Sequence, residues 1–261
     1  MNVTAIIPAH LASVRFPRKI LYKFHGLPMI EHVRRRALLS GSVNEVFVAT
    51  CDDEIASTVE GFGGKVIRTS NSHTNGTSRI AEAVKDIECS HVILLQGDEP
   101  LLLPRHLVQM SDAIKANVHG SVWNATGPIE NPEELDKHSF VKCSVSPENR
   151  IMYCFRRSPG YSDFHSQKKY VRKILGLIAF EKEFLLKLAS LPASRVETYE
   201  FIEQMRIIEN GYNIQSVPVF PSLPSVNEPE DATVILDYCE SDIEQIEWLR
   251  QTLDFDLWKN D

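Results

Sequence analysis

Apolar and polar positions form two kinds of segment along the first half of the chain. Short apolar runs, which predict buried strands, are separated by stretches whose apolar residues recur at helical spacing. The predicted strands are 3–8, 46–50, 65–68 and 92–95, and the predicted helices are 29–39, 53–62, 77–87 and 105–116. This alternation is typical of a parallel sheet that is covered by helices on both faces.

The pattern changes from about residue 131. Shorter strands are predicted at 141–145, 152–155, 175–180 and 214–219. They are interrupted by the polar stretch 158–170, which has little periodicity. We interpret that stretch as a mobile flap or an insertion that forms a dimer. A helix predicted over 240–253 closes the chain.

Composition narrows the class of protein. With 261 residues, 43% of them hydrophobic, the chain can bury a large core. A net charge of -7 disfavours nucleic-acid binding, which usually requires a basic face. No apolar stretch approaches the ~20 residues of a membrane helix, and no signal peptide is recognisable, so we expect no membrane insertion and a cytoplasmic location.

Histidines and cysteines do not indicate a metal site. The nine histidines are scattered, and neither residue type shows the pairwise spacing of zinc ligands. The five cysteines are an odd number at unrelated spacings, and several lie in or beside apolar runs. We therefore expect reduced and mostly buried thiols.

A polar, cationic loop follows the first predicted strand. Arg15, Arg18 and Lys19 lie within five positions, and Ser13 adds a hydroxyl group. Cations at the carboxyl end of a buried parallel strand are typical of a site for polyphosphate. A solvated surface loop is the alternative, because no Walker or Gly-x-Gly-x-x-Gly motif defines the phosphate geometry.

A carboxylate follows a later strand. Gly97 permits a sharp exit from the strand 92–95 and places Asp98 at its tip. Mg2+ takes few protein ligands and shares its coordination shell with phosphate oxygens, so one Asp opposite a cationic loop can hold a metal-bound nucleotide. The alternative is that Asp98 caps the following helix.

Five segments together resemble the 3-deoxy-manno-octulosonate (KDO) cytidylyltransferases. They are the N-terminal pattern, 75–79, 96–100, 203–206 and 226–231, and they occur in the family's order. The resemblance implies a Mg2+-dependent enzyme that transfers CMP from CTP to the anomeric hydroxyl of KDO or a KDO-like 3-deoxy sugar acid, releasing pyrophosphate. It also implies a role in lipopolysaccharide or capsule supply, and a homodimer.

The resemblance implies a fold and a division of the chain. The expected fold class is α/β, with a mostly parallel, Rossmann-like sheet flanked by helices and a smaller mixed α/β region for dimerisation and sugar binding. Residues 1–130 are the expected nucleotide-binding core, 131–218 the acceptor-binding and dimerisation region, and 219–261 a return to the core with the C-terminal helix.

The resemblance also implies roles for single residues. Lys19 and Asp98 are the expected catalytic residues, with Asp98 on Mg2+ and with Arg15 and Lys19 on the β- and γ-phosphates. The residues expected to contact the nucleotide are Ala9, His10, Ser13, Arg15, Lys19, Asn75, Gly76, Thr77, Arg79 and Gln96. The amide of Gln96 suits the edge of cytosine. Thr77 is alternatively only the N-cap of its helix.

Residues for the acceptor acid are expected in the second half of the chain. Arg156 or Arg157 could bind the sugar carboxylate through a bidentate fork, and the family motif favours Arg156. Glu200 lies at helical spacing from Glu203 and Gln204, so we expect one helix face that accepts hydrogen bonds from sugar hydroxyls. The alternative is a solvated acidic face above a buried stripe. That stripe would comprise Phe201, Ile202, Ile207 and Ile208.

The sequence departs from the family in ways that affect metal and acceptor. Asn227 stands where the family has a second metal-binding Asp, and an amide ligates Mg2+ without adding charge. Glu228 or Asp231 could compensate. His10 stands where the family has Arg, and Arg18 where it has Gly.

The strand at 173–180 carries apolar residues near the positions of the family's His and Tyr. This favours an acceptor that is less hydroxylated than KDO or differently substituted. Two alternative functions therefore stay open. One is the same reaction on another sugar acid. The other is a nucleotide-binding relative without turnover, which is suggested by Asn227 at the position of the family's Asp.

Overall fold

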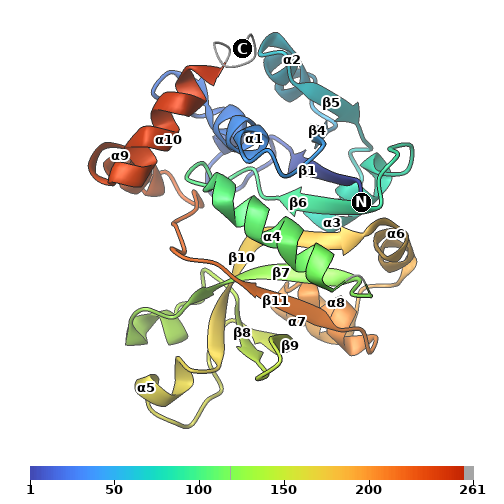
Figure 1. The fold of residues 1–261 in the computed structure, drawn as a ribbon, viewed down its shortest axis with the longest axis vertical. Coiled ribbons are helices and arrows are strands. Elements are labelled where there is room, and N and C mark those ends of the chain that lie inside the picture. Colours follow the sequence, from blue (N-terminus) through green and yellow to red (C-terminus); the bar gives the residue numbers. More distant parts are fainter. Residues whose placement is uncertain (118, 256–261) are drawn as a thin grey trace. The chain divides into compact units, whose positions relative to one another are not determined.

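The computed structural model describes residues 1–117 and 119–255, which divide into two compact units. Unit 1 comprises Met1–Ser111 and the chain from Leu223 onward, and unit 2 comprises Asp112–Ser222. Helix α4 (Pro104–Ala116) carries the chain from the first unit into the second (Figure 1). In the part of the chain that the structure describes, no helix is long and apolar enough to cross a membrane.

A parallel sheet of four strands lies at the centre of unit 1 (Figure 1). Its order is β5 (Lys65–Arg68), β4 (Glu45–Thr50), β1 (Val3–Ala9) and β6 (His91–Leu95). These strands confirm the four predicted from the apolar runs. The central strand β1 is buried almost throughout because it has a paired strand on each side and helices packed over it.

Helices α1 (Met29–Leu39), α2 (Asp53–Gly61) and α3 (Gly76–Ala83) pack against this sheet. The bounds of α1 are those predicted. The predicted extension of α3 to residue 87 is wrong, because the chain turns more tightly after Ala83, with the N–H of Ile87 bonded to the carbonyl of Val84.

Short elements at the end of the cationic loop were not predicted. They are a 3-10 turn, η1 (Lys19–Leu21), and the hairpin of β2 (Lys23–Phe24) and β3 (Leu27–Pro28).

The C-terminal helix predicted over 240–253 is α10 (Ile243–Leu253), whose end is confirmed. Its predicted start is wrong, and the preceding helix α9 (Asp231–Ser241) was not predicted. Asp242 is extended between them, and its carboxylate caps α10 by accepting the N–H of Gln245 at 2.9 Å. In Figure 1, α10 lies beside α1, and Gln245 accepts a hydrogen bond from buried Arg36 at 2.7 Å.

Five strands of unit 2 form a closed circuit of pairings. They are β7 (Val122–Pro128), β8 (Lys142–Val145), β9 (Arg150–Phe155), β10 (Val171–Glu181) and β11 (Ile214–Pro218). Only β7 and β11 are parallel, and the other four pairings are antiparallel. Sequence analysis predicted four of these strands and missed β7.

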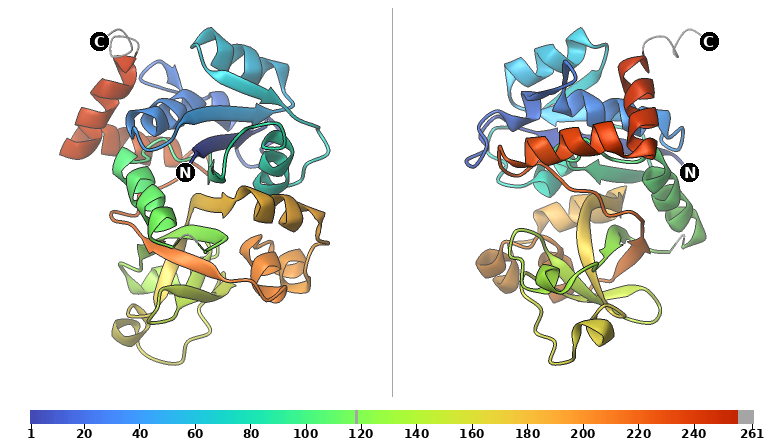
Figure 2. Two further views of the ribbon diagram at one scale, coloured as in Figure 1. Left: turned by 45° about the vertical axis from the view of Figure 1, so that its right-hand side comes forward. Right: turned by 90° about the vertical axis from the view of Figure 1, so that its left-hand side faces the viewer.

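The remaining elements of unit 2 are short. They are η2 (Pro132–Leu135), α5 (Phe164–Gln167), α6 (Lys182–Ser190), α7 (Arg195–Glu200) and α8 (Gln204–Glu209). The stretch expected to be a flap or a dimer-forming insertion contains α5, in the loop before β10 (Figure 2). Asp163 caps α5, and buried Gln167 accepts a hydrogen bond from Ser158 at 2.6 Å, so the loop has internal polar contacts.

The five cysteines are free. Cys143, Cys154 and Cys239 are buried, which confirms the expectation of mostly buried thiols, and burial raises the pKa of Cys143 to about 12.

Candidate functional site

The two predicted catalytic residues meet in unit 1. Lys19 Nζ donates to Asp98 Oδ2 at 2.6 Å and to the carbonyl oxygen of Val226 at 2.8 Å. The side chains of Lys19 and Asp98 are 17% and 23% exposed, so the ion pair is only partly screened by water. The backbone N–H of Val226 also bonds to the carbonyl of Asp98 at 2.9 Å. The tip of β6 is thus tied to a segment distant in the sequence.

Gly97 makes this meeting possible. A Cβ atom at Gly97 would lie 2.5 Å from Ile20 Cδ1 and 3.3 Å from Ile7 Cγ2. The end of β6 therefore passes close to the side chain of Ile20 in η1, which begins with Lys19, and a Cβ atom at Gly97 would require that side chain to move. Sequence analysis explained Gly97 by the turn that follows β6. The structure adds a second reason for glycine here, which is the close contact with the Ile20 side chain of η1.

Arg15 contacts the segment that carries Asn227. Its guanidinium lies 3.2 Å from Asn227 Oδ1 and 3.4 Å from Glu228 Oε1. Asp231 Oδ2 accepts the backbone N–H groups of Asn227 at 2.7 Å and Glu228 at 2.9 Å. Glu228 therefore pairs with a cation and Asp231 holds the turn before α9, so each carboxylate already has a role in this arrangement.

The end of β1 supplies a second set of expected nucleotide residues. Ala9 is buried as the last residue of β1, and the N–H of Ser13 bonds to the carbonyl of Leu11 at 2.9 Å in the loop that follows. Desolvation lowers the pKa of His10, and the cations of Arg79 and Lys19 lower it further. The carboxylates of Asp52 and Asp98 act in the opposite direction, so the charges around His10 are mixed.

The loop before α3 is shaped by Asn75. Its Oδ1 accepts the N–H of Ser78 at 2.8 Å, so Asn75 is the N-cap and the alternative that gave this role to Thr77 is wrong. Gly76 lies against β1, where a Cβ atom would be 3.1 Å from Pro8. Gln96, at the end of β6, has no side-chain hydrogen-bond partner in the described ranges, so both ends of its amide are available.

Arg79 belongs to α3 and is buried rather than exposed. Its side chain is nearly buried and donates to Thr69 Oγ1 at 2.8 Å and to the carbonyl of Ser70 at 3.2 Å. In this arrangement Arg79 fastens the segment after β5 to α3. A cation in a sequence motif does not reveal such a role, because the motif does not show which partners lie opposite.

The expected acceptor residues all lie in unit 2. Arg156 donates to the carbonyl oxygens of Glu200 at 2.8 Å, His138 at 3.1 Å and Phe201 at 3.0 Å. Three of its five N–H groups are thus used on the backbone. Arg157 lies next to it and pairs with Asp136 through Nε at 2.8 Å.

The prediction that Glu200 shares one helix face with Glu203 and Gln204 is wrong. α7 ends at Glu200 and α8 begins at Gln204, because Phe201 adopts a left-handed conformation with φ 55°. The side chain of Phe201 is 80% exposed, so it does not belong to the buried stripe. Ile202 and Ile207 are buried as expected.

Asn124 is a polar residue that sequence analysis missed. It is buried on β7, accepts a hydrogen bond from Gln204 Nε2 at 3.1 Å, and donates to the carbonyl of Leu175 at 3.1 Å. Leu175 lies at an irregularity in β10, the strand whose side chains are apolar near the family's polar positions. A polar group of β7 therefore reaches β10, and Gln204 at the start of α8 is bonded to that group. The available signal was an Asn within the apolar run that forms β7.

A model of the cytidylyltransferase family matches residues 4–214 of this chain. The chain belongs to the cytidylyltransferase family. It is 40% identical to the 8-amino-3,8-dideoxy-manno-octulosonate cytidylyltransferase of Shewanella sediminis, over 92% of this chain and 98% of the relative. It is 35% identical to the 3-deoxy-manno-octulosonate cytidylyltransferase of Geobacter sulfurreducens, over 91% of this chain and 99% of that relative.

A solved structure of CMP:2-keto-3-deoxy-manno-octonic acid synthetase complexed with CTP is similar to this cytidylyltransferase. The TM-score is 0.87 at 32% identity, and the match covers 93% of this chain and all of that chain. The likeness confirms an α/β fold with a sheet and flanking helices.

The cytidylyltransferase offers oxygen donors where a magnesium ion is expected. Within the described residues there is no group of three or more His, Cys, Asp and Glu side chains that could hold a metal. Asp98 supplies one carboxylate, and Asn227 supplies an amide oxygen from the segment tied to it. Hard oxygen donors of this kind fit Mg2+, which completes its shell with water and phosphate oxygens.

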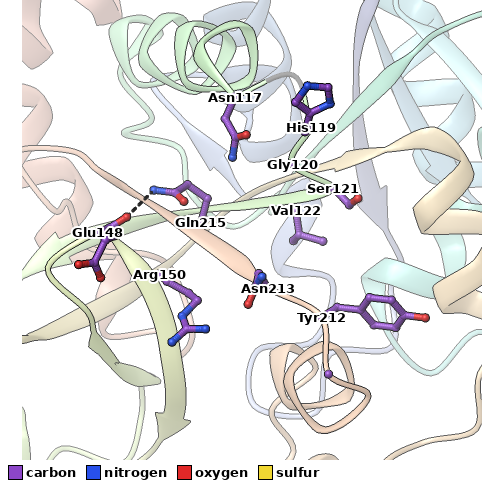
Figure 3. A pocket seen from close by; sticks show the side chains of 11 residues that line it. Asn117, His119, Gly120, Ser121, Val122, Glu148, Arg150, Tyr212, Asn213 and Gln215 are labelled. Atoms are coloured by element: carbon purple, nitrogen blue, oxygen red, sulfur yellow. Dashed lines mark hydrogen bonds between the residues drawn. The ribbon is translucent and has the colours of Figure 1, made fainter.

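Unit 2 of the cytidylyltransferase also contains a polar cavity of about 600 Å³ (Figure 3). It is lined by residues at the starts of β7, β9 and β11, including Asn117, His119, Arg150, Asn213 and Gln215. No residue predicted for the site lines it. Arg150 begins β9 and Arg156 follows its end, so the cavity and the acceptor residues lie at opposite ends of that strand.

Proposed function

We propose that this protein transfers CMP from CTP to the anomeric hydroxyl of an eight-carbon 3-deoxy sugar acid and releases pyrophosphate. The observation that carries the proposal is the contact of Lys19 with Asp98 and Val226, beside the contact of Arg15 with Asn227. The contacts support the proposal because two cations lie close to a carboxylate at the carboxyl end of β6, and this carboxylate is the one that we propose ligates the metal. Relatives 35% and 40% identical over nearly the whole chain bear names of this enzyme class.

Nucleotidyl transfer requires positioning and charge neutralisation more than covalent chemistry from the protein. Lys19 and Arg15 bind the β- and γ-phosphates of CTP, and Ser13 adds a hydroxyl donor. Asn75, Gly76 and Thr77 line the nucleoside, and the amide of Gln96 binds the edge of cytosine. Mg2+ held by Asp98 and Asn227 would neutralise charge on the α-phosphate and the leaving pyrophosphate.

Arg156 and its neighbours bind the acceptor. Because Arg156 holds the carbonyls of Glu200 and Phe201, it fixes the segment between α7 and α8 that carries Glu203. Its two remaining N–H groups can bind the sugar carboxylate. Glu200, Glu203 and Gln204 accept hydrogen bonds from the acid. Arg157 is the alternative partner of the carboxylate, since only its Nε is used within the described residues.

The division of the chain by function stays part of the proposal. Residues 1–130 and 219–261 form the nucleotide-binding core with its Rossmann-like sheet, and residues 131–218 bind the acceptor and form a cytoplasmic homodimer. Three large aromatic residues within 131–218, Tyr161, Tyr199 and Phe201, are exposed and could contribute to such an interface. Sedimentation equilibrium tests the dimer, and a monomer at micromolar concentration would contradict it.

The acceptor is either KDO or its 8-amino-3,8-dideoxy analogue. The two acids differ at C8, where a hydroxyl or an amine stands. The relative named for the amino sugar is more similar in sequence than the one named for KDO, and Glu200 and Glu203 could bind an ammonium group. These observations favour the amino sugar.

Pyrophosphate release with CTP and each acid tests both the proposed reaction and the proposed acceptor. We expect pyrophosphate release when CTP and an acid are both present, and no release when the acid is omitted. We expect kcat/KM to be higher with the amino sugar than with KDO. A preference for KDO would reverse the choice of acceptor. A preference for ATP would contradict the assignment of cytosine. Binding of CTP without release with any acid would instead favour a non-catalytic relative.

A further inference from the structure

His73 is joined to helix α3 at two points. Its Nδ1 lies 3.1 Å from Ser78 Oγ, and its Nε2 is hydrogen-bonded to the carboxylate of Glu82. Glu82 also accepts the backbone N–H of Ser70 at 3.1 Å. The ring is 14% exposed. His73 therefore links the segment after β5 to the first two turns of α3, on either side of the loop proposed to contact the nucleoside.

The hydrogen bonds around Ser78 constrain the protons on this ring. Ser78 Oγ also lies 3.2 Å from the carbonyl oxygen of Asn75. A hydroxyl has one proton and a carbonyl can only accept, so when Ser78 donates to Asn75 it can only accept from His73. Nδ1 must then carry a proton.

The other ring nitrogen faces an ionised group. The hydrogen bond with His73 lowers the pKa of Glu82, as does the N–H of Ser70. A carboxylate accepts, so Nε2 must carry a proton as well. All these contacts are satisfied together only by the imidazolium form of His73.

A neutral ring changes the arrangement at Asn75. With its one proton on Nε2, Nδ1 accepts the hydroxyl proton of Ser78, and the carbonyl of Asn75 loses that donor. Asn75 is the N-cap of α3 and precedes Gly76, which lies against Pro8 of β1. The hydroxyl of Ser78 thus turns between Asn75 and His73 according to the charge on the ring.

We propose that His73 is a positioning residue whose protonation strengthens CTP binding by completing the hydrogen bonds of the Asn75–Thr77 turn. The inference rests on the proposed function, because that function makes this turn part of the nucleotide site. The affinity for CTP therefore rises when the ring gains its second proton. The added positive charge also favours an anionic nucleotide.

Other groups near the loop titrate or carry charge. On α3 and just after it they are Glu82, Arg79 and Lys85, and at the ends of the strands packed against α3 they are His10, Asp52 and Asp98, with Lys19 nearby. The terminal phosphate of CTP also titrates. A pH profile of the wild type alone is therefore insufficient, and the test compares variants in which all these groups are retained.

The experiment measures the dissociation constant of CTP by calorimetry from pH 5.5 to 8.0. The proteins are the wild type, His73→Gln and the matched control His165→Gln, which changes an exposed residue of α5 in unit 2. A glutamine amide can donate to Glu82 and accept from Ser78, as the neutral ring does, but gains no proton.

At pH 8.0 we expect His73→Gln to bind CTP nearly as tightly as the wild type. At pH 5.5 the wild type and the His165→Gln control should bind roughly tenfold tighter than His73→Gln, the value of one charge-assisted hydrogen bond. Equal pH profiles for the wild type and His73→Gln would overturn the inference.

A second measurement separates this inference from the proposed function. In the free protein, the backbone amide resonances of Asn75, Gly76 and Thr77 should move with pH in the wild type and much less in His73→Gln. If they do so and CTP does not bind at any pH, the proposed function fails while the coupling within the protein stands. If they are insensitive to pH in the wild type, the inference is wrong whatever the function.

Discussion

Several side chains in unit 1 make contacts within the free protein and also have a role in the proposed reaction. Lys19 and Asp98 neutralise each other in the free protein, and Arg15 covers the amide oxygen of Asn227. Binding of CTP would give the two cations phosphate oxygens as new partners. Asp98 and Asn227 would then be free to accept a metal.

Asp98→Asn tests the assignment of the catalytic carboxylate. The substitution keeps the size of the side chain but removes the charge expected to hold Mg2+, so we predict a fall in kcat by a factor of about 100 to 1000 with the fold retained. Pyrophosphate release and a thermal melt measure the two effects. Asp112→Asn, at an exposed position paired with Lys115, is the control and should behave as the wild type. Near-normal turnover of Asp98→Asn at low Mg2+ would contradict the role.

Asn227→Asp tests the proposed second metal position, where the amide supplies no charge. Glu228 already pairs with Arg15, and Asp231 holds the backbone of the turn, so we expect neither to replace the missing charge. A carboxylate at position 227 should therefore lower the Mg2+ concentration for half-maximal rate and raise turnover. An unchanged or raised Mg2+ requirement would indicate that the new charge is neutralised by Arg15 or repelled by its neighbours.

At the scale of elements, close contacts decide where the functional side chains lie. The end of β6 passes η1 at Gly97, the loop before α3 lies against β1 at Gly76, and Phe201 separates α7 from α8. In each case a local backbone feature brings together residues from distant parts of the sequence, or separates residues that are near in it.

Gly97→Ala tests the first of these contacts. The added Cβ would lie 2.5 Å from Cδ1 of Ile20, so this buried side chain must change its position. We predict a loss of about 1 to 3 kcal/mol in the free energy of unfolding, measured by chemical denaturation. Gly61→Ala is the matched control, because a Cβ there meets nothing within 4 Å and α2 tolerates alanine. Equal stability of the two variants would contradict the steric role of Gly97.

At the scale of the whole molecule, ligand binding and stability are linked. A ligand that binds only the folded protein raises its free energy of unfolding, by about 2.7 kcal/mol at a concentration one hundred times the dissociation constant. CTP should therefore raise the melting temperature of the wild type.

In Lys19→Ala, the same CTP concentration should raise the melting temperature much less than in the wild type, since Lys19 is a proposed phosphate ligand. The remaining rise in melting temperature should also depend less on salt. Lys115→Ala, which changes an exposed lysine on α4, is the control. An equal rise in melting temperature for the wild type and Lys19→Ala would contradict the role of Lys19 as a phosphate ligand.

The sequence alone determined the elements whose burial produces a strong periodic pattern. The strands of the parallel sheet and helix α1 are examples, because β1 is covered on both faces and reads as a continuous apolar run. Motif order also indicated the family, since the segments around Lys19, Asp98 and Asn227 carry specific chemical groups.

Tertiary structure decided what those groups contact. The position of Val226 beside Lys19, the use of Arg79 and Arg156 on backbone carbonyls, and the burial of Asn124 depend on distant segments meeting. Local breaks such as Phe201 and Asp242 were also missed, because the residues beside them keep a helical pattern while the backbone itself turns. Periodicity reports which face of an element is buried, but the partner of a polar atom is set by the packing of the folded chain.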